Sequence, residues 1–386
     1  MIRKKSYVVA DQMISSLGFG SEDNFAMLCE GNSGIRKSSD KQLSQTDVHL
    51  SLVDTEKLNS LFNDQSYQGS FTRYEKLHLL SISDAISQLT NPLNSDETLL
   101  IISSTKGNID LLSLAGAQFD EKRVYLWNSA EIINKALGFK NDPVLISNAC
   151  ISGVVALSVA KDYIEKGLYK NVIVSGADIA SEFVISGFQS FKAIGSTACK
   201  PFDKNRDGIT LGEGASTIIV SDSPLEKDQS PIILAGTGIS NDANHISGPS
   251  RTGDGLALSI SKAMQEAGIE ADSVDYISAH GTATPYNDEM ESKALELAKV
   301  NHAPLNSCKA YFGHTLGAAG LLESSALIHS MRSNIIFPSI GCDEIGVSGD
   351  INLITEKTEK EMYTALKTAS GFGGCNASAV FTKVLK

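Results

Sequence analysis

The sequence PVLISNACISGVVALSVAKDYIEK, residues 143–166, joins a short apolar run to a helical pattern with no loop between them. The run from Val144 to Ser147 is almost entirely apolar, which predicts a central strand in a sheet that is covered on both faces. Apolar residues then recur at helical spacing from Gly153 to Lys166. The stretch therefore predicts one unit of an α/β fold, with Cys150 at the point where the strand meets the helix.

A similar unit occurs later in the chain, at residues 305–332, with the sequence LNSCKAYFGHTLGAAGLLESSALIHSMR. A strand is expected from Leu305 to Lys309, and a helix with one apolar face is expected from Gly317 to Arg332. His314 lies between them, as Cys150 does in the first unit. The recurrence indicates an internal duplication.

Short β-branched runs alternate with helical patterns along the rest of the chain. They predict further strands at residues 98–103, 171–175, 216–220, 231–238, 275–279 and 377–384. Strands interleaved with helices predict an α/β architecture with a mainly parallel sheet. The polar stretch from Ser221 to Ser230 is the best internal boundary, and it divides the chain into two halves, residues 1–225 and 226–386.

Length and composition limit the class of protein. The 386 residues exceed what one ordinary core needs, and a content of 42% hydrophobic and 20% charged residues excludes global disorder. The formal net charge of −12 argues against nucleic acid or an anionic membrane as the main partner, because both reward positive charge. The apolar run at residues 6–10 is too short for a signal peptide, and no later run reaches about 18 residues, so a soluble cytoplasmic protein is expected.

Cys150 is the first candidate for chemistry. A thiol at a helix amino terminus lies at the positive end of the helix dipole, which stabilises the thiolate and creates a nucleophile. The alternative for a lone cysteine is a buried structural role, which we adopt for Cys29, Cys199, Cys308 and Cys342. The sequence contains no close CxxC pair and no HExxH spacing, so we expect neither a metal site nor disulfides.

Two histidines follow predicted strands. The motif AHGTATP, residues 279–285, presents His280 at the carboxyl end of the sheet, where α/β folds bind ligands. His314 has the corresponding place in the second unit, although either residue alone would be interpreted as an ordinary loop histidine. Glu323 falls on a later turn of the following helix, and we expect it to form a buried pair with Lys309.

A fourth motif, GFGGCN at residues 371–376, contains three glycines that permit a mobile loop, and it does not match a dinucleotide-binding fingerprint. In this order and spacing, the four motifs resemble the elongating β-ketoacyl-[acyl-carrier-protein] synthases of the thiolase superfamily. The similarity spans nearly the whole chain and includes SLG at 16–18, GNSGI at 31–35, PFDKNRDG at 201–208 and LGEGA at 211–215. It implies an α/β, thiolase-like fold of two duplicated βαβαβαββ halves in a layered α-β-α-β-α core.

The resemblance also implies an activity, the decarboxylative Claisen condensation of a 3-oxoacyl-carrier synthase, in fatty-acid or more specialised polyketide-type synthesis. Cys150 would accept an acyl group from the phosphopantetheine of an acyl carrier protein, and malonyl-carrier would lose CO2 to give the carbanion that attacks this thioester. His280 and His314 would stabilise the enolate through neutral N–H groups. Lys309 and Glu323 would set the electrostatics of the site and the orientation of His314.

Further site residues follow from the same resemblance. The backbone N–H groups of Cys150 and Phe372 would form the oxyanion hole, and Phe372 would also act as a gate for the acyl chain. Contacts with pantetheine or substrate are assigned to Thr282, Thr284, Phe188 and Lys106. No cofactor is expected on the enzyme itself, since the phosphopantetheine belongs to the carrier.

The implied partners are an acyl carrier protein and a second subunit. An acidic enzyme that serves an acidic carrier needs a local positive surface, because like charges reduce affinity and association rate. The resemblance assigns this surface to Arg73, Lys122, Arg123 and Lys192, each of which could equally be an ordinary solvated charge. It also implies a homodimer, or a heterodimer with a homologous subunit, formed through the strand from Asn171 to Ser175.

Three departures from the family pattern bear on the substrate. Ile151 follows the cysteine where serine is common, and Cys375 stands where threonine is usual. Lys106 falls near an expected aliphatic position of the acyl tunnel, and an ammonium buried against an alkyl chain is costly. We therefore expect a polyene, aryl-primed or otherwise polar chain rather than a long saturated one.

Four other functions remain as alternatives. A chain-length-factor-like subunit would lack the nucleophile, so Cys150 opposes it. A thiolase acting on coenzyme A esters would use Cys375 as its second cysteine, but thiolases carry that cysteine before a glycine run, whereas here it follows one. A priming synthase uses a Cys-His-Asn set, which His314 within GHTLGAAG opposes. The remaining alternative is a binding module without enzymatic activity.

Overall fold

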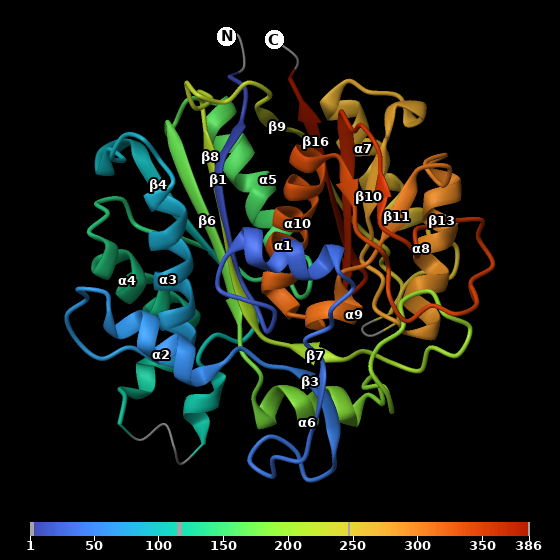
Figure 1. The fold of residues 1–386 in the computed structure, drawn as a ribbon. Helices are drawn as coiled ribbons and strands as arrows, with labels where there is room; N and C mark the ends of the chain where they lie inside the picture. Colours follow the sequence, from blue (N-terminus) through green and yellow to red (C-terminus); the bar gives the residue numbers. More distant parts are fainter. Residues whose placement is uncertain (1–3, 114–117, 246–247, 385–386) are drawn as a thin grey trace.

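A computed structural model describes residues 4–113, 118–245 and 248–384 of the chain. Among these residues, one continuous sheet of 11 strands runs through the molecule in the order β13-β11-β10-β15-β16-β9-β1-β8-β6-β4-β5. Its two halves form separate β-layers, with helices between them and on both outer sides (Figure 1). The predicted α-β-α-β-α layering is confirmed.

The five strands of each half have the same order: counted along the chain, they lie first, fifth, fourth, second, third. The amino-terminal half has the order β1-β8-β6-β4-β5 and consists of β1 (Tyr7–Ile14), β4 (Thr98–Ser103), β5 (Val144–Ile146), β6 (Asn171–Asp178) and β8 (Gly214–Ser221). The carboxyl-terminal half has the order β9-β16-β15-β10-β11 and consists of β9 (Ile232–Asn241), β10 (Tyr276–Ser278), β11 (Pro304–Asn306), β15 (Thr364–Gly371) and β16 (Cys375–Lys383). β13 (Asn352–Leu353) extends the second half beyond β11.

The pairing within the two halves is also the same. In each half the first two pairs of neighbouring strands are antiparallel and the last two are parallel. The matching topology confirms the internal duplication. The prediction of a mainly parallel sheet is wrong, because β8 and β16 run antiparallel to their neighbours. The halves are joined where β1 pairs with β9, at Tyr7 with Ile233 and Val8 with Ile232. The segment between them runs from the end of β8 at Ser221 to the start of β9.

Helices fill the three α-layers. The two central helices are α5 (Ser152–Glu165) and α10 (Ala319–Ser333), which follow β5 and β11. They pack against each other and against strands of both halves, so they lie between the two sheet layers (Figure 1). The outer layers are formed by α3 (Arg73–Ser87) and α4 (Leu126–Leu137) on one side, and by α7 (Asp254–Ala267) and α8 (Pro285–Leu297) on the other.

Shorter elements complete the described chain. They are α1 (Ser21–Cys29), α2 (Thr55–Asn63), α6 (Glu182–Ser190), α9 (Lys309–Phe312), β2 (Arg36–Ser38), β3 (Val48–Ser51), β7 (Leu211–Gly212), β12 (Ile335–Ile336) and β14 (Thr358–Glu359), with 3-10 turns at η1 (Ser95–Glu97), η2 (Ile109–Leu112), η4 (Glu121–Val124), η5 (Ala271–Ser273) and η6 (Leu316–Ala318). Among the residues described, no helix has the length and apolarity needed to cross a membrane.

Two further predictions about the sheet are wrong. β5 lies at the edge of the sheet, paired with β4, and its three residues are only partly buried, so it is not the central strand that its apolar sequence indicated. β6 pairs with β4 on one side and with β8 on the other, so the strand from Asn171 to Ser175 has no free edge for a dimer partner. An apolar run indicates a demand for burial, but strand order depends on contacts between distant segments.

Candidate active site

Cys150 lies in a strained turn between β5 and α5. The residue before it, Ala149, has a φ of 43°, which is uncommon for a residue other than glycine. Ser152 stabilises the turn, since its Oγ accepts the Asn148 N–H at 2.8 Å and donates to the Ala149 carbonyl at 2.7 Å. The backbone of Gly371 also approaches closely, because a Cβ there would lie 3.1 Å from the Cys150 nitrogen. The thiol is thus held where the amino-terminal half meets the GFGGCN loop.

The surroundings of Cys150 favour the protonated thiol. Burial raises its pKa to about 12, and the neighbouring Cys375 raises it further, while Lys309 acts in the opposite direction. Burial therefore opposes the stabilisation of the thiolate that the position before a helix was expected to give. The thiol precedes the first turn of α5, which begins at Ser152. Burial raises the pKa of the thiol more than the charges of Lys309 and Lys106 lower it.

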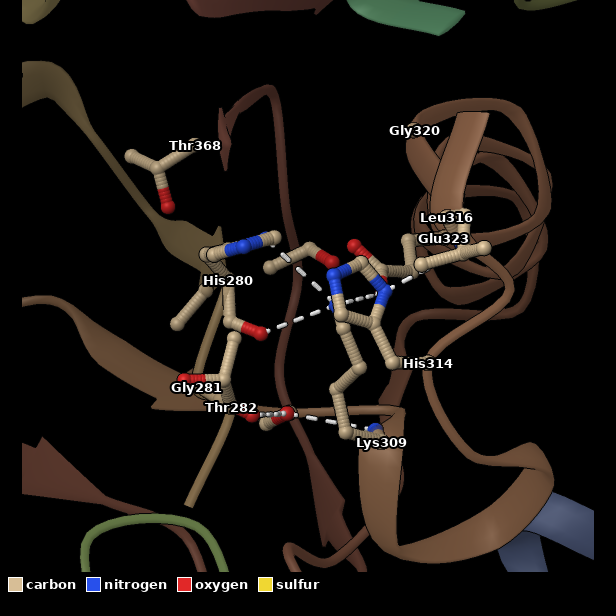
Figure 2. Close-up of polar contacts among 12 residues, drawn as sticks. His280, Gly281, Thr282, Lys309, His314, Leu316, Gly320, Glu323 and Thr368 are labelled. Atoms are coloured by element: carbon tan, nitrogen blue, oxygen red, sulfur yellow. Dashed lines mark hydrogen bonds and ion pairs between the residues drawn. The ribbon is translucent and has the colours of Figure 1, made fainter. Parts of the chain in front are cut away.

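His280 and His314 lie side by side and are almost fully buried, with 2% and 3% of their surface exposed. Their ring centroids are 5.3 Å apart and the rings are nearly perpendicular, at 84° (Figure 2). Glu291 of α8 holds the backbone of the first histidine, because its carboxylate accepts the N–H groups of His280 and Gly281, each at 2.8 Å. Thr368 donates to the same carboxylate at 2.6 Å. The two junctions predicted from the sequence therefore meet in space.

Hydrogen bonds fix the tautomer of both rings. The Lys309 ammonium lies 3.4 Å from Nδ1 of His280, and an ammonium can only donate, so this nitrogen is the acceptor. The backbone N–H of Leu316 donates to Nδ1 of His314 at 3.3 Å, with the same consequence. In each neutral ring the proton then resides on Nε2. The site therefore has two imidazole N–H groups available as donors.

Both imidazoles are kept neutral by their surroundings. Burial, followed by the charge of Lys309, lowers the pKa of each histidine well below its ordinary value, and Lys367 contributes to both. Protonating either ring would place a further positive charge in a dry interior next to a lysine. The rings can therefore donate hydrogen bonds at neutral pH without carrying charge.

The predicted buried pair of Lys309 and Glu323 is confirmed. The Lys309 ammonium bonds one oxygen of Glu323 and also donates to the His280 carbonyl at 3.0 Å (Figure 2). The other oxygen of Glu323 lies 2.7 Å from the ammonium of Lys367, which the sequence analysis did not identify. A lysine within the small, otherwise uncharged run TALKTAS, residues 364–370, is the signal that could have indicated it.

Asp178 was also missed. It ends β6, is fully buried, and accepts hydrogen bonds from Ser104 Oγ at 2.8 Å, from the Thr105 N–H at 3.0 Å and from the Gly317 N–H at 2.7 Å. Burial raises its pKa. The carboxylate joins the loop after β4 to the start of η6, and so it fixes the two halves relative to each other beside the site.

Cys150, His280 and His314 line a cavity of about 490 Å³. Its lining includes eight residues that the sequence analysis named: Cys150, His280, His314, Thr282, Thr284, Phe188, Phe372 and Lys192. The ring of Phe372 stacks on Phe188 at 5.6 Å and meets the edge of Phe191 at 5.7 Å. Phe191 was not predicted. The proposed gate is therefore held between two aromatic side chains at the carboxyl end of α6.

Thr282 and Thr284 have structural bonds as well as access to the cavity. Their hydroxyls lie 3.0 Å apart, and Thr284 caps α8 by accepting the Asn287 N–H at 3.3 Å. The Thr282 N–H donates to Asp288 at 2.9 Å. The hydroxyls are thus fixed in position at the wall of the cavity.

Three other predicted positions differ from expectation. Arg73 forms an ion pair with the buried Glu213, and Arg123 forms one at 3.0 Å with the buried Glu75, so neither arginine is a free surface cation. Lys106 is exposed and does not line the cavity, although its charge is close enough to lower the pKa of the Cys150 thiol. A cation on a polar stretch of sequence is compatible with a surface or a buried pair, and only the distant carboxylate decides between them.

The two remaining cations of that set are exposed. Lys192 follows α6 and lines the cavity, whereas Lys122, in η4, does not. Of the four carrier-surface candidates, Lys192 is therefore the one at the cavity.

Comparison with known families gives two matches along the chain. Residues 122–224 match the amino-terminal domain of β-ketoacyl synthases, and residues 232–343 match the carboxyl-terminal domain of the same family. A 3-oxoacyl-[acyl-carrier-protein] synthase 2 from Vibrio harveyi is 29% identical over 426 aligned residues, covering the whole of both chains. A synthase of the same name from Coxiella burnetii is 32% identical over 274 residues, covering 66% of each chain.

Solved structures agree with this assignment. A ketosynthase from Xenorhabdus doucetiae, determined in complex with its chain length factor, superposes with a TM-score of 0.85 at 25% identity, covering 99% of this chain and 98% of that one. The ishigamide ketosynthase/chain length factor superposes with a TM-score of 0.88 at 24% identity, over 98% and 99% of the two chains, and shows the fold. This chain belongs to the β-ketoacyl synthase family of the thiolase superfamily, the acyl-transferring condensing enzymes of fatty-acid and polyketide synthesis.

Proposed function

We propose that this chain elongates an acyl chain held on Cys150 with a two-carbon unit from malonyl-carrier. The observation that carries the proposal is that one cavity is lined by Cys150, His280 and His314. In the first step the Cys150 sulfur attacks the acyl thioester of an acyl carrier protein, and the acyl–sulfur bond of the carrier breaks. The thiol proton of Cys150 ends on the departing phosphopantetheine sulfur, so the step is balanced. No cofactor of the enzyme's own is needed.

The high pKa of Cys150 sets a condition on this step. A protonated thiol is a weak nucleophile, so the proton must leave as the thioester arrives. The oxyanion that develops on the thioester carbonyl would be stabilised by the backbone N–H groups of Cys150 and Phe372. The close approach of Gly371 to the Cys150 nitrogen supports this pairing of the two segments.

The second step uses the neutral imidazoles. The malonyl thioester carbonyl would accept the Nε2–H groups of His280 and His314 as the carboxylate leaves as CO2 and its bonding electrons form an enolate. The enolate carbon then attacks the acyl group on Cys150, forming the carbon–carbon bond and releasing the cysteine sulfur, which regains a proton. Donors already in position stabilise the developing charge more than water would, because they need no reorganisation.

The substrate is proposed to be a specialised, unsaturated or polar chain. Lys106 carries an exposed ammonium whose charge influences the Cys150 thiol, and the cavity opening carries Phe191 and Tyr286, exposed by 59% and 79%. Exposed aromatic rings at the cavity favour a polarisable occupant over a saturated one. Rapid elongation of long saturated acyl-carriers, at the rate of the other substrates, would contradict this.

A partner subunit is proposed at the edge of β5. This strand is apolar, only partly buried, and hydrogen-bonded on one side in the single chain, and it leads directly to Cys150. An unpaired apolar edge strand needs a covering partner. The ketosynthase from Xenorhabdus doucetiae was solved with a chain length factor, which supports a homologous subunit as the partner here. Native mass spectrometry of the chain alone, and after co-expression with a homologous subunit, distinguishes a homodimer from a heterodimer.

The activity is tested by incubating the protein with a panel of acyl-carriers and malonyl-carrier, and following both carrier and enzyme by intact-protein mass spectrometry. The wild type should gain an acyl group and then form a 3-oxoacyl-carrier. Cys150→Ala should do neither, whereas Cys29→Ala, which changes a half-buried cysteine on α1, should do both. Condensation by Cys150→Ala at the wild-type rate would remove this residue from its role, and the absence of any condensation by wild type would favour a non-catalytic, chain-length-factor-like subunit.

A further inference from the structure

Lys367 is a fully buried lysine beside the end of β10, close enough to His280 and His314 for its charge to act on both rings. It projects from β15, and none of its surface is exposed. Its ammonium lies 2.7 Å from Glu323 Oε2 and donates to the carbonyls of Thr368 at 2.6 Å and Ser278 at 3.0 Å. An uncompensated ammonium in a protein interior would lose its proton or destabilise the fold, so this full set of acceptors is needed to retain the charge.

The contacts of Lys367 lead to both parts of the histidine site. Ser278 is the last residue of β10, and the next carbonyl, that of Ala279, accepts a weaker bond at 3.4 Å immediately before His280. Glu323 shares its two oxygens between Lys309 and Lys367, so one ammonium fixes the carboxylate that holds the other. Removing Lys367 would free both the end of β10 and the orientation of Glu323.

We propose that Lys367 is a positioning residue of the condensation site, which anchors Glu323 and the end of β10 and holds a second positive charge near His280 and His314. The proposal rests on the proposed function, in which both imidazoles act as neutral donors. Lys309, Glu323 and Lys367 together carry a net charge of +1 when all three are ionised. That charge opposes protonation of the rings, consistent with the depressed pKa of both histidines, to which Lys367 contributes.

Other charged or titratable groups face the rings from every side. Lys309 approaches from α9, Glu323 from α10, and Cys150 from the turn before α5. Glu291 approaches from α8, where it is bonded to the backbone N–H groups of His280 and Gly281. Without Lys367, the carboxylates of Glu291 and Glu323 outnumber the one ammonium near the imidazoles, that of Lys309. Each ring should then take up a proton at higher pH.

The test compares two buried lysines. Lys367→Met removes the charge near the histidines. Lys161→Met removes an equally buried charge on α5, where Lys161 is 1% exposed and lies 2.7 Å from Glu165 and 2.8 Å from Glu266. Decarboxylation of malonyl-carrier is measured for the wild type and each variant, from pH 8 down to the pH at which the protein begins to unfold. The acid limb, where the rate falls as the imidazoles gain protons, should move to higher pH by on the order of one unit in Lys367→Met and should not move in Lys161→Met.

A double variant separates charge from packing. Lys367→Met combined with Glu323→Gln restores the net charge of +1, carried by Lys309, without restoring the lost contacts. The acid limb of this double variant should return toward that of the wild type, although its rate stays lower. An acid limb in Lys367→Met that equals the wild-type limb, or an equal shift in Lys161→Met, would overturn the proposal.

Two further arms keep the test decisive. If Lys367→Met does not fold, Lys367→Gln replaces it, because the glutamine amide still donates to the carbonyls. If neither variant folds while Lys161→Met does, the role of Lys367 is in folding alone and the proposal is overturned. A direct NMR titration of isotope-labelled histidine, without substrate, should show two rings that gain protons at higher pH in the variant. That measurement is independent of turnover, so an inactive wild type would refute the proposed function and leave the titration to decide the role of Lys367.

Discussion

The two halves of the chain bury polar clusters of different kinds against equivalent strands, β6 and β15. In the amino-terminal half the cluster is neutral: His78 Nδ1 lies 2.8 Å from Ser175 Oγ, and Thr217 donates to the same hydroxyl at 3.0 Å. In the carboxyl-terminal half the cluster is ionic, with Glu323 between Lys309 and Lys367. The same topology thus carries two different solutions for polar groups in its core.

The difference follows from what lies above each cluster. Buried ions cost several kcal/mol of desolvation each, and hydrophobic or neutral replacements are often no less stable, so stability alone does not explain the ionic cluster. It lies close to His280 and His314, whose pKa values are lowered by burial first and then by the charges of Lys309 and Lys367. The duplicated fold therefore places the proposed nucleophile, Cys150, in one half and the ionic cluster with both histidines in the other.

The largest expected effect comes from removing the histidines. His280→Ala and His314→Ala should each lower decarboxylation and condensation by about 10²–10³-fold, because each removes one preorganised donor. Acylation of Cys150, which depends on the other half, should persist. Intact-protein mass spectrometry reports both steps, and loss of acylation in parallel with condensation would contradict the division of labour between the halves.

The contact between the halves at Gly371 should come next. In Gly371→Ala the added Cβ would lie 3.0 Å from Cys375 Sγ and 3.1 Å from the Cys150 nitrogen, so the nucleophile's backbone must shift by a few tenths of an ångström. We expect acylation to slow by about tenfold, since small displacements of reacting groups have large effects on rate. Gly187→Ala, in α6 with open space around the new methyl group, is the matched control and should leave the rate unchanged.

The neutral cluster predicts an effect on stability instead of rate. Burial lowers the pKa of His78 from its ordinary value of 6.5 to about 3. Below pH 6.5 the unfolded chain therefore binds a proton that the folded chain does not, and the stability contributed by this group falls as the pH decreases to about 3, by at most about 1.4 kcal/mol per pH unit. In His78→Gln the free energy of unfolding should depend less steeply on pH over this range, as measured by urea denaturation; an unchanged slope would argue against a neutral His78.

The smallest expected effect concerns the carrier. Lys192→Glu should raise the KM for carrier-borne substrates about fivefold, because a cation at the cavity becomes an anion facing an acidic partner. Substrates on free pantetheine should be unaffected. Lys227→Glu, in the exposed connection between β8 and β9, makes the same charge change away from the cavity. An equal rise in KM in both variants would reduce the effect to overall charge.

Much of the site was predictable because its residues lie at the ends of strands. Strand-to-helix junctions are visible in one sequence as an apolar run followed by helical spacing, and Cys150 and His314 each lie between two such segments. Parallel strands present their carboxyl ends at one edge, so side chains from several junctions meet there. The buried pair of Lys309 and Glu323 was predictable for the same reason, since the helix after the junction carries Glu323 back over the strand.

The amino-acid sequence alone determined the order of the elements, the duplication and the identity of the residues at the carboxyl ends of the strands, because these depend on local periodicity. The tertiary structure alone decided which groups are charged and what each cation pairs with. Arg73 became internal because Glu213 lies across the fold, Lys367 joined the site because β15 lies beside β10, and the protonated form of the Cys150 thiol is favoured because the folded chain surrounds it. Burial and ion pairing depend on contacts between distant segments, and no local pattern of residues encodes them.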